Sequence, residues 1–295
     1  MGGKMDKVAD IASLFASDHC FDLSESDRCF DIIRKAANII HVGGVVVFPA
    51  KCLYGLAADA LNPAAVQRVF EIKQRPLTNP LLVLIDDISQ LDLLVKPVSE
   101  NRSSFQSGEI QSEEIQSGLN GSPLKQKTNL HGHYYAPPNY ENQGGIFMVK
   151  RYLTASALSL IEKFWPGNIT LVFNAIDDLP KALTAGTGKI GIRMPGHPVA
   201  RSLVRQVGSP ITGTSANISG KAGCKEIAML DPDILSHVDM VLDSGILKGG
   251  IGSTVVDVTC DPVKIVREGE ISRDEVIKAI RYCSKSAGSL KACND

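Results

Sequence analysis

The sequence lacks an apolar run long enough to cross a membrane. Its longest such run, Ile39 to Phe48, is interrupted by His41 and is far shorter than the roughly 20 residues that a spanning helix needs. The N-terminal residues have no apolar signal core, and Asp6 stands where a myristoylation motif has Ser or Thr. We therefore expect a cytoplasmic protein without a membrane partner.

Closely spaced cysteines are also absent. The seven cysteines are scattered and odd in number, and no Cys-x-x-Cys pair occurs. This spacing argues against a disulfide framework and against a structural zinc site. His131 and His133 form a close pair, but they lie in a polar stretch that is typical of a solvated loop. We expect no metal site in the protein itself.

Neither sign of charge is in excess. The 295 residues include 31 Lys and Arg against 32 Asp and Glu, so the formal net charge is -1. This balance does not indicate nucleic-acid binding, although a neutral total is compatible with a locally basic cavity. Hydrophobic residues make up 44% and charged residues 21%, a composition that excludes disorder throughout the chain.

Strand and helix patterns alternate along the chain, which predicts an α/β fold with a mixed sheet. Asn62 and Ser272 are predicted helix caps, and Glu275 completes a capping box with Ser272. Helices are predicted over residues 24–41, 63–75, 154–164, 198–207 and 272–282. Strands are predicted over residues 45–48, 81–85, 169–173, 190–194, 210–213, 240–242, 253–258 and 264–267.

The stretch 98–145 differs in character. Ser, Gln, Asn, Gly and Glu dominate it, and Glu109-Ile-Gln-Ser112 recurs as Glu114-Ile-Gln-Ser117. Such a stretch buries too little apolar surface to offset its ordering entropy, so we expect a disordered polar insertion. A tolerated surface insertion is favoured over a partner-binding role.

Two loops carry unusual polar groups. Lys73 and Arg75 are locked between a helix end and Pro76, where they either clamp a polyphosphate or complement the helix dipole. The turn 211–220 holds four hydroxyl side chains and one amide, which suit phosphate, ribose or carbonyl groups. The glycines of 249–252 either allow a ligand close to the backbone or serve as turn residues.

Familiar nucleotide and nucleophile motifs are missing. Gly186-Thr-Gly-Lys189 resembles a Walker motif, but Ile190 stands where Ser or Thr is required. No Gly-x-Gly-x-x-Gly fingerprint opens a helix after a strand. Gly213-Thr-Ser-Ala-Asn217 ends in Asn where a nucleophile elbow has Gly. Any nucleotide must therefore be held in a different way.

Taken in order, the loops resemble the YrdC-like family, the threonylcarbamoyl-AMP synthases. The matching stretches are Phe48-Pro49 with Tyr54-Gly-Leu56, Lys73-Gln-Arg75-Pro76, Trp165-Pro-Gly167, Ile192-Arg-Met-Pro195, Thr214-Ser-Ala-Asn-Ile-Ser-Gly220, Ser253-Thr-Val-Val-Asp257 and Arg267-Glu-Gly269. They predict a single YrdC-like domain over 1–295, with its core at about 26–282. The resemblance implies the short form without an additional C-terminal domain.

The resemblance implies a fold and a reaction. The fold is an open, twisted mixed α/β sheet with flanking helices around a positively lined cavity. The reaction converts L-threonine, bicarbonate and ATP, with Mg2+, to threonylcarbamoyl-AMP and pyrophosphate. A separate tRNA threonylcarbamoyl transferase complex would then place the group on adenosine in tRNA.

Residues are carried over by position. The expected ATP-binding residues are Lys73, Arg75, Asn79, Lys189, Ser215, Asn217, Gly223 and Arg267. The expected threonine-binding residues are Cys52, Arg193, Gly213 and Ser253. Lys73, Arg75, Ser215 and Asn217 are expected to be catalytic, because cations and hydrogen-bond donors stabilise adenylyl transfer electrostatically. A guanidinium suits a carboxylate, so Arg193 is expected to pair with that of threonine.

The chain departs from the family pattern near the threonine site. Relatives usually have Pro-Thr-Asp/Glu-Thr where this chain has Pro49-Ala50-Lys51-Cys52, and proline at the position of Asn168. Lys51 is expected to lower the pKa of Cys52, which would favour redox sensitivity, although a simple replacement is favoured. Two alternatives to the synthase stay open: a module that binds double-stranded RNA or tRNA, and a divergent carbamoyl transferase.

Overall fold

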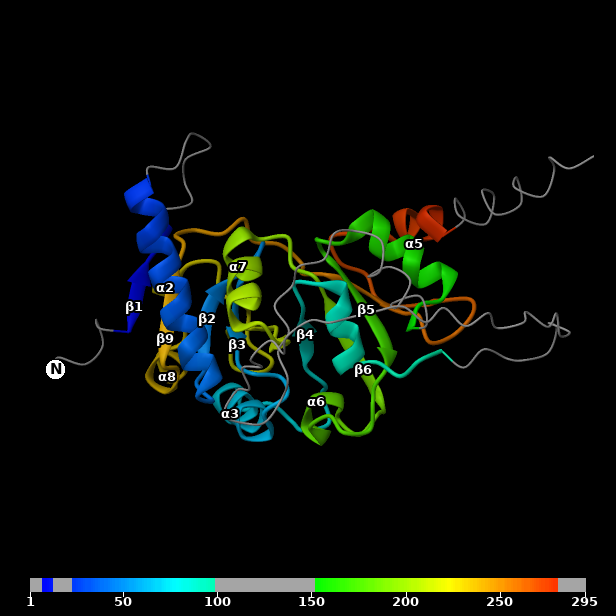
Figure 1. Ribbon diagram of the computed structural model, residues 1–295, viewed down its shortest axis with the longest axis horizontal. Coiled ribbons are helices and arrows are strands. Elements are labelled where there is room, and N and C mark those ends of the chain that lie inside the picture. Colours follow the sequence, from blue (N-terminus) through cyan, green and yellow to red (C-terminus); the bar gives the residue numbers. More distant parts are fainter. Residues whose placement is uncertain (1–6, 13–22, 99–151, 281–295) are drawn as a thin grey trace, which may run out of the picture.

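Two mixed β-sheets stand side by side in the computed structural model, with helices packed on their outer faces (Figure 1). The structure describes residues 7–12, 23–98 and 152–280. The predicted insertion at 98–145 lies outside these residues apart from its first position, as do His131 and His133. Within the described ranges, no helix has both the length and the apolarity that crossing a membrane requires.

The first sheet has five strands. Their spatial order is β1 (Val8–Asp10), β9 (Met240–Asp243), β2 (Val46–Pro49), β3 (Tyr54–Ala57) and β8 (Thr214–Ser215). Strand β9 pairs parallel with both β1 and β2, whereas the β2–β3 and β3–β8 pairs are antiparallel. The sequence patterns predicted β2 and β9 but not β1, β3 or β8, which are short and depend on partners distant in the chain.

The second sheet has six strands. Their spatial order is β11 (Lys264–Arg267), β10 (Thr254–Asp257), β5 (Ile169–Asn174), β6 (Lys189–Arg193), β4 (Leu82–Leu84) and β7 (Ile211–Thr212). Strands β10 and β5 are parallel, as are β4 and β6, and the other neighbours are antiparallel. This arrangement confirms the predicted mixed α/β fold, and all six strands lie where the sequence patterns place them.

Gly213 joins the two sheets. It separates β7, in the second sheet, from β8, in the first, so one short segment takes part in both. A Cβ atom at Gly213 would lie 2.6 Å from Cγ of Leu84, a distance that real Cβ contacts do not reach. A side chain at position 213 would therefore displace the Leu84 side chain on the neighbouring strand β4 (Leu82–Leu84).

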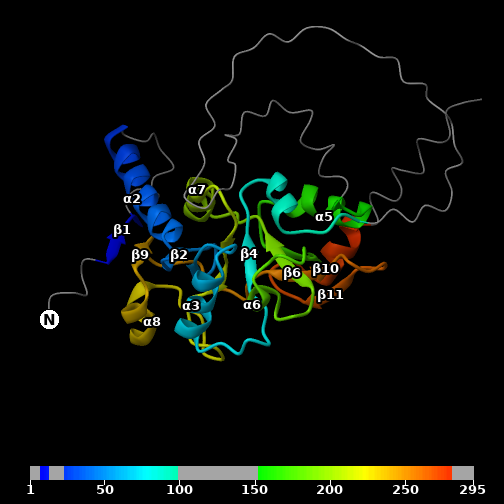
Figure 2. The same cartoon turned by 60° about the horizontal axis from the view of Figure 1, so that its bottom comes forward.

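Two hydrophobic cores hold the helices to the sheets. Helices α2 (Leu23–His41) and α7 (Pro198–Val207) lie side by side against β2 (Figure 1). Ile40, Leu203 and Phe48 are buried in the core that these elements share. The remaining helices contribute to the larger core. They are α3 (Pro63–Lys73), the 3-10 helix η1 (Ile88–Leu93), α5 (Ala155–Phe164), α6 (Lys181–Thr184), the 3-10 helix η3 (Ile227–Met229) and α8 (Pro232–His237). Figure 2 shows α3, α5, α6 and α8 around the strands.

Helix ends follow the predicted capping chemistry. The Asn62 side chain accepts hydrogen bonds from the N–H groups of Ala64 and Ala65. Residues 273–280 are helical, and Ser272 and Glu275 form the predicted capping box. Helix α3 ends at Lys73, before the predicted stop at Pro76, because Gln74 adopts a left-handed conformation with φ of 48°. Lys73 thus lies in the last turn of the helix.

Candidate active site

A cavity of about 630 Å3 lies between the two sheets. Its floor is one face of the second sheet, because alternate residues of a strand point to the same side. Ten residues of the second sheet line this face, and they include cations, hydroxyls, a carboxylate, a glycine and apolar side chains. They are Leu82 and Leu84 on β4, Lys189, Gly191 and Arg193 on β6, Thr170 and Val172 on β5, and Ser253, Val255 and Asp257 on or beside β10.

Loops and first-sheet strands complete the wall. Residues 50–55 and 213–215 contribute one side, and 250–252 with Val266 and Arg267 contribute another. Among the described residues that line the cavity, five carry a positive charge and one carries a carboxylate. The cations are Lys51, Arg75, Lys189, Arg193 and Arg267, and the carboxylate is that of Asp257. A neutral protein therefore presents a strongly positive cavity, which suits an anionic ligand.

Most of the predicted site residues line this cavity. They are Cys52, Arg75, Lys189, Arg193, Gly213, Ser215, Ser253 and Arg267. The other four, Lys73, Asn79, Asn217 and Gly223, do not line it in this structure. Gly223 packs against Leu53, which its Cβ would approach to 2.7 Å. Asn79 accepts a hydrogen bond from Nε of Arg75 through its carbonyl.

Lys73 lies beneath the hydroxyl-rich turn. Its side chain is 1% exposed, and its Nζ donates to the carbonyl oxygens of Ser215 at 2.5 Å and Asn217 at 2.7 Å. Burial, together with the nearby charge of Arg75, lowers the pKa of Lys73 to about 7. Lys73 therefore supports the turn from behind, whereas Arg75 faces the cavity and is held by the carbonyls of Asn79 and Pro80.

The turn is shaped by its own amide. Asn217 donates through Nδ2 to the carbonyls of Ile218 and Lys221, at 2.9 and 2.7 Å. Its Oδ1 accepts from the Ser215 hydroxyl at 2.5 Å. Asn217 thereby orients Ser215, whose side chain is exposed to the cavity.

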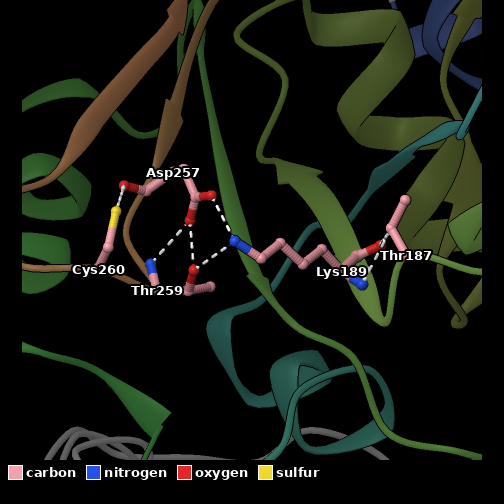
Figure 3. Close-up of polar contacts among 5 residues, drawn as sticks. All are labelled: Thr187, Lys189, Asp257, Thr259 and Cys260. Atoms are coloured by element: carbon pink, nitrogen blue, oxygen red, sulfur yellow. Dashed lines mark hydrogen bonds and ion pairs between the residues drawn. The ribbon is translucent and has the colours of Figure 1, made fainter.

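One end of the cavity floor carries a lysine–aspartate pair (Figure 3). Lys189 Nζ lies 2.7 Å from Oδ2 of Asp257 and donates to the Thr259 hydroxyl at 2.8 Å. Burial alone raises the pKa of Asp257, but hydrogen bonds from Lys189 and Thr259 hold it below its ordinary value. The carboxylate is thus ionised and shares the wall with a cation. The sequence patterns did not identify Asp257 as part of the site.

The other end carries Arg193. It lies four residues from Lys189 on β6, which separates the two Cα atoms by about 13 Å. Its Nε donates to the carbonyl of Gly167 at 2.7 Å, and its Nη2 donates to Oδ1 of Asn168. Burial lowers the pKa of Arg193 to about 10, partly opposed by Cys52 and Glu270. The guanidinium stays cationic at neutral pH and is fixed in direction.

Arg193 belongs to a network that reaches the cavity edge. Nδ2 of Asn168 donates to Oε2 of Glu270, and Nζ of Lys51 lies 2.5 Å from Oε1 of the same carboxylate. Sγ of Cys52 lies 3.6 Å from Oε2. Nothing in the sequence pattern pointed to Glu270, because its partners are up to 219 residues away.

Lys51 lowers the pKa of Cys52, as expected, but the net shift of that pKa is upward. Burial of the thiol and the negative charge of Glu270 raise the pKa of Cys52, and they outweigh the opposite effect of Lys51 and Arg193. Lys51 is engaged with Glu270 instead of the thiol. Cys52 is therefore a buried, protonated thiol, which argues against redox sensitivity at this position.

Ser253 is held by two neighbours. Its hydroxyl lies 2.8 Å from that of Thr170, and its carbonyl accepts from Nη2 of Arg267 at 2.8 Å. Thr170 is a lining residue that the sequence patterns did not assign. The contact with Arg267 fixes the loop 250–253 against the end of β11, so that both face the cavity.

An α/β protein with two mixed sheets and a cation-lined cavity between them is the class that this fold and site define. The family model described as “Telomere recombination”, that of the Sua5, YciO and YrdC proteins, matches residues 38–109 and 145–269. The chain belongs to this Sua5/YciO/YrdC family, as the sequence motifs indicate. The gap in the match, residues 110–144, falls within the predicted insertion.

Curated relatives are named threonylcarbamoyl-AMP synthase. That of Pyrococcus abyssi is 30% identical over 248 residues, which cover 84% of this chain and 57% of the relative. That of Bacillus subtilis is 31% identical over 245 residues, covering 83% and 55%. That of Schizosaccharomyces pombe is 31% identical over 250 residues, covering 83% and 52%. The chain thus spans about half the length of these relatives.

Solved structures confirm the fold. P. abyssi Sua5 complexed with L-threonine has a TM-score of 0.65 at 27% identity, covering 92% of this chain and 60% of that chain. Escherichia coli YciO has a TM-score of 0.55 at 22% identity, covering 82% and 90%. The second likeness concerns the fold alone.

Proposed function

We propose that the protein is an L-threonylcarbamoyladenylate synthase, a nucleotidyltransferase that forms threonylcarbamoyl-AMP and pyrophosphate from L-threonine, bicarbonate and ATP. The observation that carries the proposal is one cavity lined by eight of the residues that the family pattern assigns to ATP and threonine. The names of the relatives and the threonine complex of P. abyssi Sua5 support it.

The dimensions and charges of the cavity suit these substrates. Arg193 and Ser253 at one end offer a guanidinium and a hydroxyl to the threonine carboxylate and its neighbours. Arg75, Ser215, Lys189 and Arg267 offer cations and a hydroxyl to the phosphates. We assign Lys73 and Asn217 to the support of the turn that carries Ser215, and Asn79 to the support of Arg75.

The reaction needs positioning and charge neutralisation more than covalent help. The threonine amine attacks the carbon of bicarbonate, and loss of water leaves a carbamate. A carbamate oxygen then attacks the α-phosphorus of ATP, the bond to the β-phosphate oxygen breaks, and pyrophosphate leaves. Arg75 and the donors of the turn stabilise the negative charge that develops on the phosphates.

Mg2+ enters with ATP in this proposal. No cluster of three or more His, Cys, Asp or Glu side chains that could hold a metal occurs among the described residues. Mg2+ is usually held by one or two carboxylates together with substrate phosphates, and Asp257 supplies a carboxylate on the wall. The metal would neutralise phosphate charge as pyrophosphate leaves.

The product would serve a tRNA threonylcarbamoyl transferase complex in the cytoplasm. The family resemblance implies this partner, and the chemistry is consistent with it, because a mixed carbamic–phosphoric anhydride is an activated acyl group that a transferase can consume. We also propose that residues 1–295 form a single domain.

The test is pyrophosphate release by the purified chain with ATP, Mg2+ and bicarbonate, comparing L-threonine, L-serine and no amino acid. We expect threonine-dependent release, with threonylcarbamoyl-AMP identified by mass spectrometry. Pyrophosphate release that does not depend on threonine would favour a carbamoyl transferase with another acceptor. Salt-dependent binding of double-stranded RNA or tRNA without turnover would favour an RNA-binding module. Either result would overturn the proposal.

A further inference from the structure

Glu270 contacts three residues of the cavity wall without lining the cavity itself. Its carboxylate lies 2.5 Å from Lys51 Nζ and 3.6 Å from Cys52 Sγ, and it accepts from Asn168 Nδ2. The side chains of Lys51 and Glu270 are 43% and 31% exposed. A partly exposed pair of this kind contributes little to folding stability, so its significance lies in where it places charge.

The backbone holds Glu270 in place. Its N–H donates to the carbonyl of Gly252 at 3.0 Å. The N–H groups of Gly269 and Ile271, on either side, donate to the Thr254 hydroxyl at 2.9 and 3.1 Å. A Cβ at Gly269 would lie 2.5 Å from the carbonyl carbon of Ser253, so the loop packs directly on the cavity wall. The carboxylate is therefore anchored to the scaffold of the site.

The network determines which cation a ligand meets. Lys51 and Arg193 both line this end, but Lys51 is neutralised by Glu270. Arg193 uses Nε and Nη2 for Gly167 and Asn168, and a guanidinium carries five N–H donors, so donors remain for a ligand carboxylate. Asn168 holds the guanidinium in one direction because its own amide is held by Glu270.

We propose that Glu270 is a positioning residue that makes this end of the cavity selective for an amino acid with a single carboxylate. The proposal rests on the proposed function, in which Arg193 receives the α-carboxylate. A second carboxylate, as in L-aspartate, would need Lys51 as its partner, and Glu270 already neutralises the charge of that ammonium. The negative charge of Glu270 also repels a second anion at this position.

Calorimetric binding of L-threonine and L-aspartate to the full chain, with ATP and Mg2+ present and bicarbonate omitted, tests the proposal. In Glu270→Gln, Lys51 loses its partner and the repelling charge is removed. We expect the ratio of the aspartate Kd to the threonine Kd to fall about tenfold, the effect of one close charge pair. The double variant Lys51→Gln/Glu270→Gln should reverse most of this fall, which a merely structural role of Glu270 would not produce.

Two further variants serve as controls. Glu268→Gln removes a neighbouring carboxylate that accepts from the Arg273 N–H, and it should leave the ratio unchanged. Lys51→Gln alone leaves the charge of Glu270 without its lysine partner, so aspartate should bind more weakly to this variant than to the unaltered protein. This result does not depend on whether Glu270→Gln folds.

The outcomes separate this inference from the proposed function. An unchanged ratio in both Glu270→Gln and Lys51→Gln, in protein that releases pyrophosphate with threonine, would overturn the selectivity alone. A shifted ratio in protein that binds threonine but releases no pyrophosphate would overturn the proposed function and support the selectivity.

Discussion

Lys73 and Arg75 are separated by one residue, yet the structure predicts different consequences for their removal. Lys73 is 1% exposed and donates to two carbonyl oxygens of the turn 215–217, whereas Arg75 faces the cavity. Lys73→Met keeps the length and apolar stem of the side chain but removes the donor. The two carbonyls are then left without this partner beneath the turn.

The expected cost follows from these contacts. The Asn217 carbonyl is left unsatisfied, which costs about 1–3 kcal/mol, whereas the Ser215 carbonyl still accepts from the Asn217 N–H at 3.0 Å. Removing a buried ammonium offsets part of this cost, since burial lowers the pKa of Lys73 to about 7. We expect a net loss of about 1.5 kcal/mol in the free energy of unfolding. For a chain of this size, that corresponds to a fall in Tm of roughly 3–6 °C.

Thermal unfolding and ATP binding distinguish the two residues. Lys73→Met should lower Tm without ligand and weaken ATP binding through loss of the ordered turn. The matched variant Arg75→Met should leave Tm within about 2 °C, because its bonds lie at a partly exposed loop, and should lose ATP binding. Equal Tm values for Lys73→Met and the unaltered protein would refute the assignment of Lys73 as the support of the turn.

Three further predictions concern charge and packing. At pH 8 Lys73 is mostly neutral, because its pKa is about 7, and the phosphates of ATP should raise that pKa, so ATP binding should take up protons. Calorimetry in buffers of different ionisation enthalpy measures the uptake, and uptake that persists in Lys73→Met would contradict the prediction. Asp257→Asn should free Lys189 and tighten ATP binding without Mg2+ by about threefold, and weaker binding would argue against a phosphate role for Lys189. Gly269→Ala should lower the free energy of unfolding, measured in urea, by about 1–3 kcal/mol, because the new Cβ would lie 2.5 Å from the backbone of Ser253. Gly196→Ala is the control and should be tolerated, because the atom nearest to its Cβ would be 3.6 Å away.

Local chemistry explains which parts of the fold could be predicted. The caps at Asn62 and Ser272 depend on residues two or three positions away, so the sequence is sufficient to place both helices. The buried run at 81–85 likewise predicts β4. Strand β1 has three residues and is defined by its pairing with β9, more than 200 residues later, so no local pattern could indicate it.

The same distinction applies to the site. The ordered motifs predict which loops meet, and the cavity between the sheets contains most of their polar residues. They could not show that Lys73 points beneath the turn, since the charge of a side chain does not determine its direction. Asn168 is notable in the sequence as a departure from the family pattern, but its partner Glu270 is 102 residues away and lies in no recognised motif.

The position of Gly213 between the two sheets has a consequence for the order of folding. The walls of the cavity come from segments between Phe48 and Arg267, so no short fragment contains a complete binding surface. Such distant pairings are slow to form because the intervening chain must be closed first. Secondary structure should therefore appear in refolding before nucleotide affinity does. Capture of a fluorescent ATP analogue would then report the completed junction of the sheets, at a time when circular dichroism has already reached its final value.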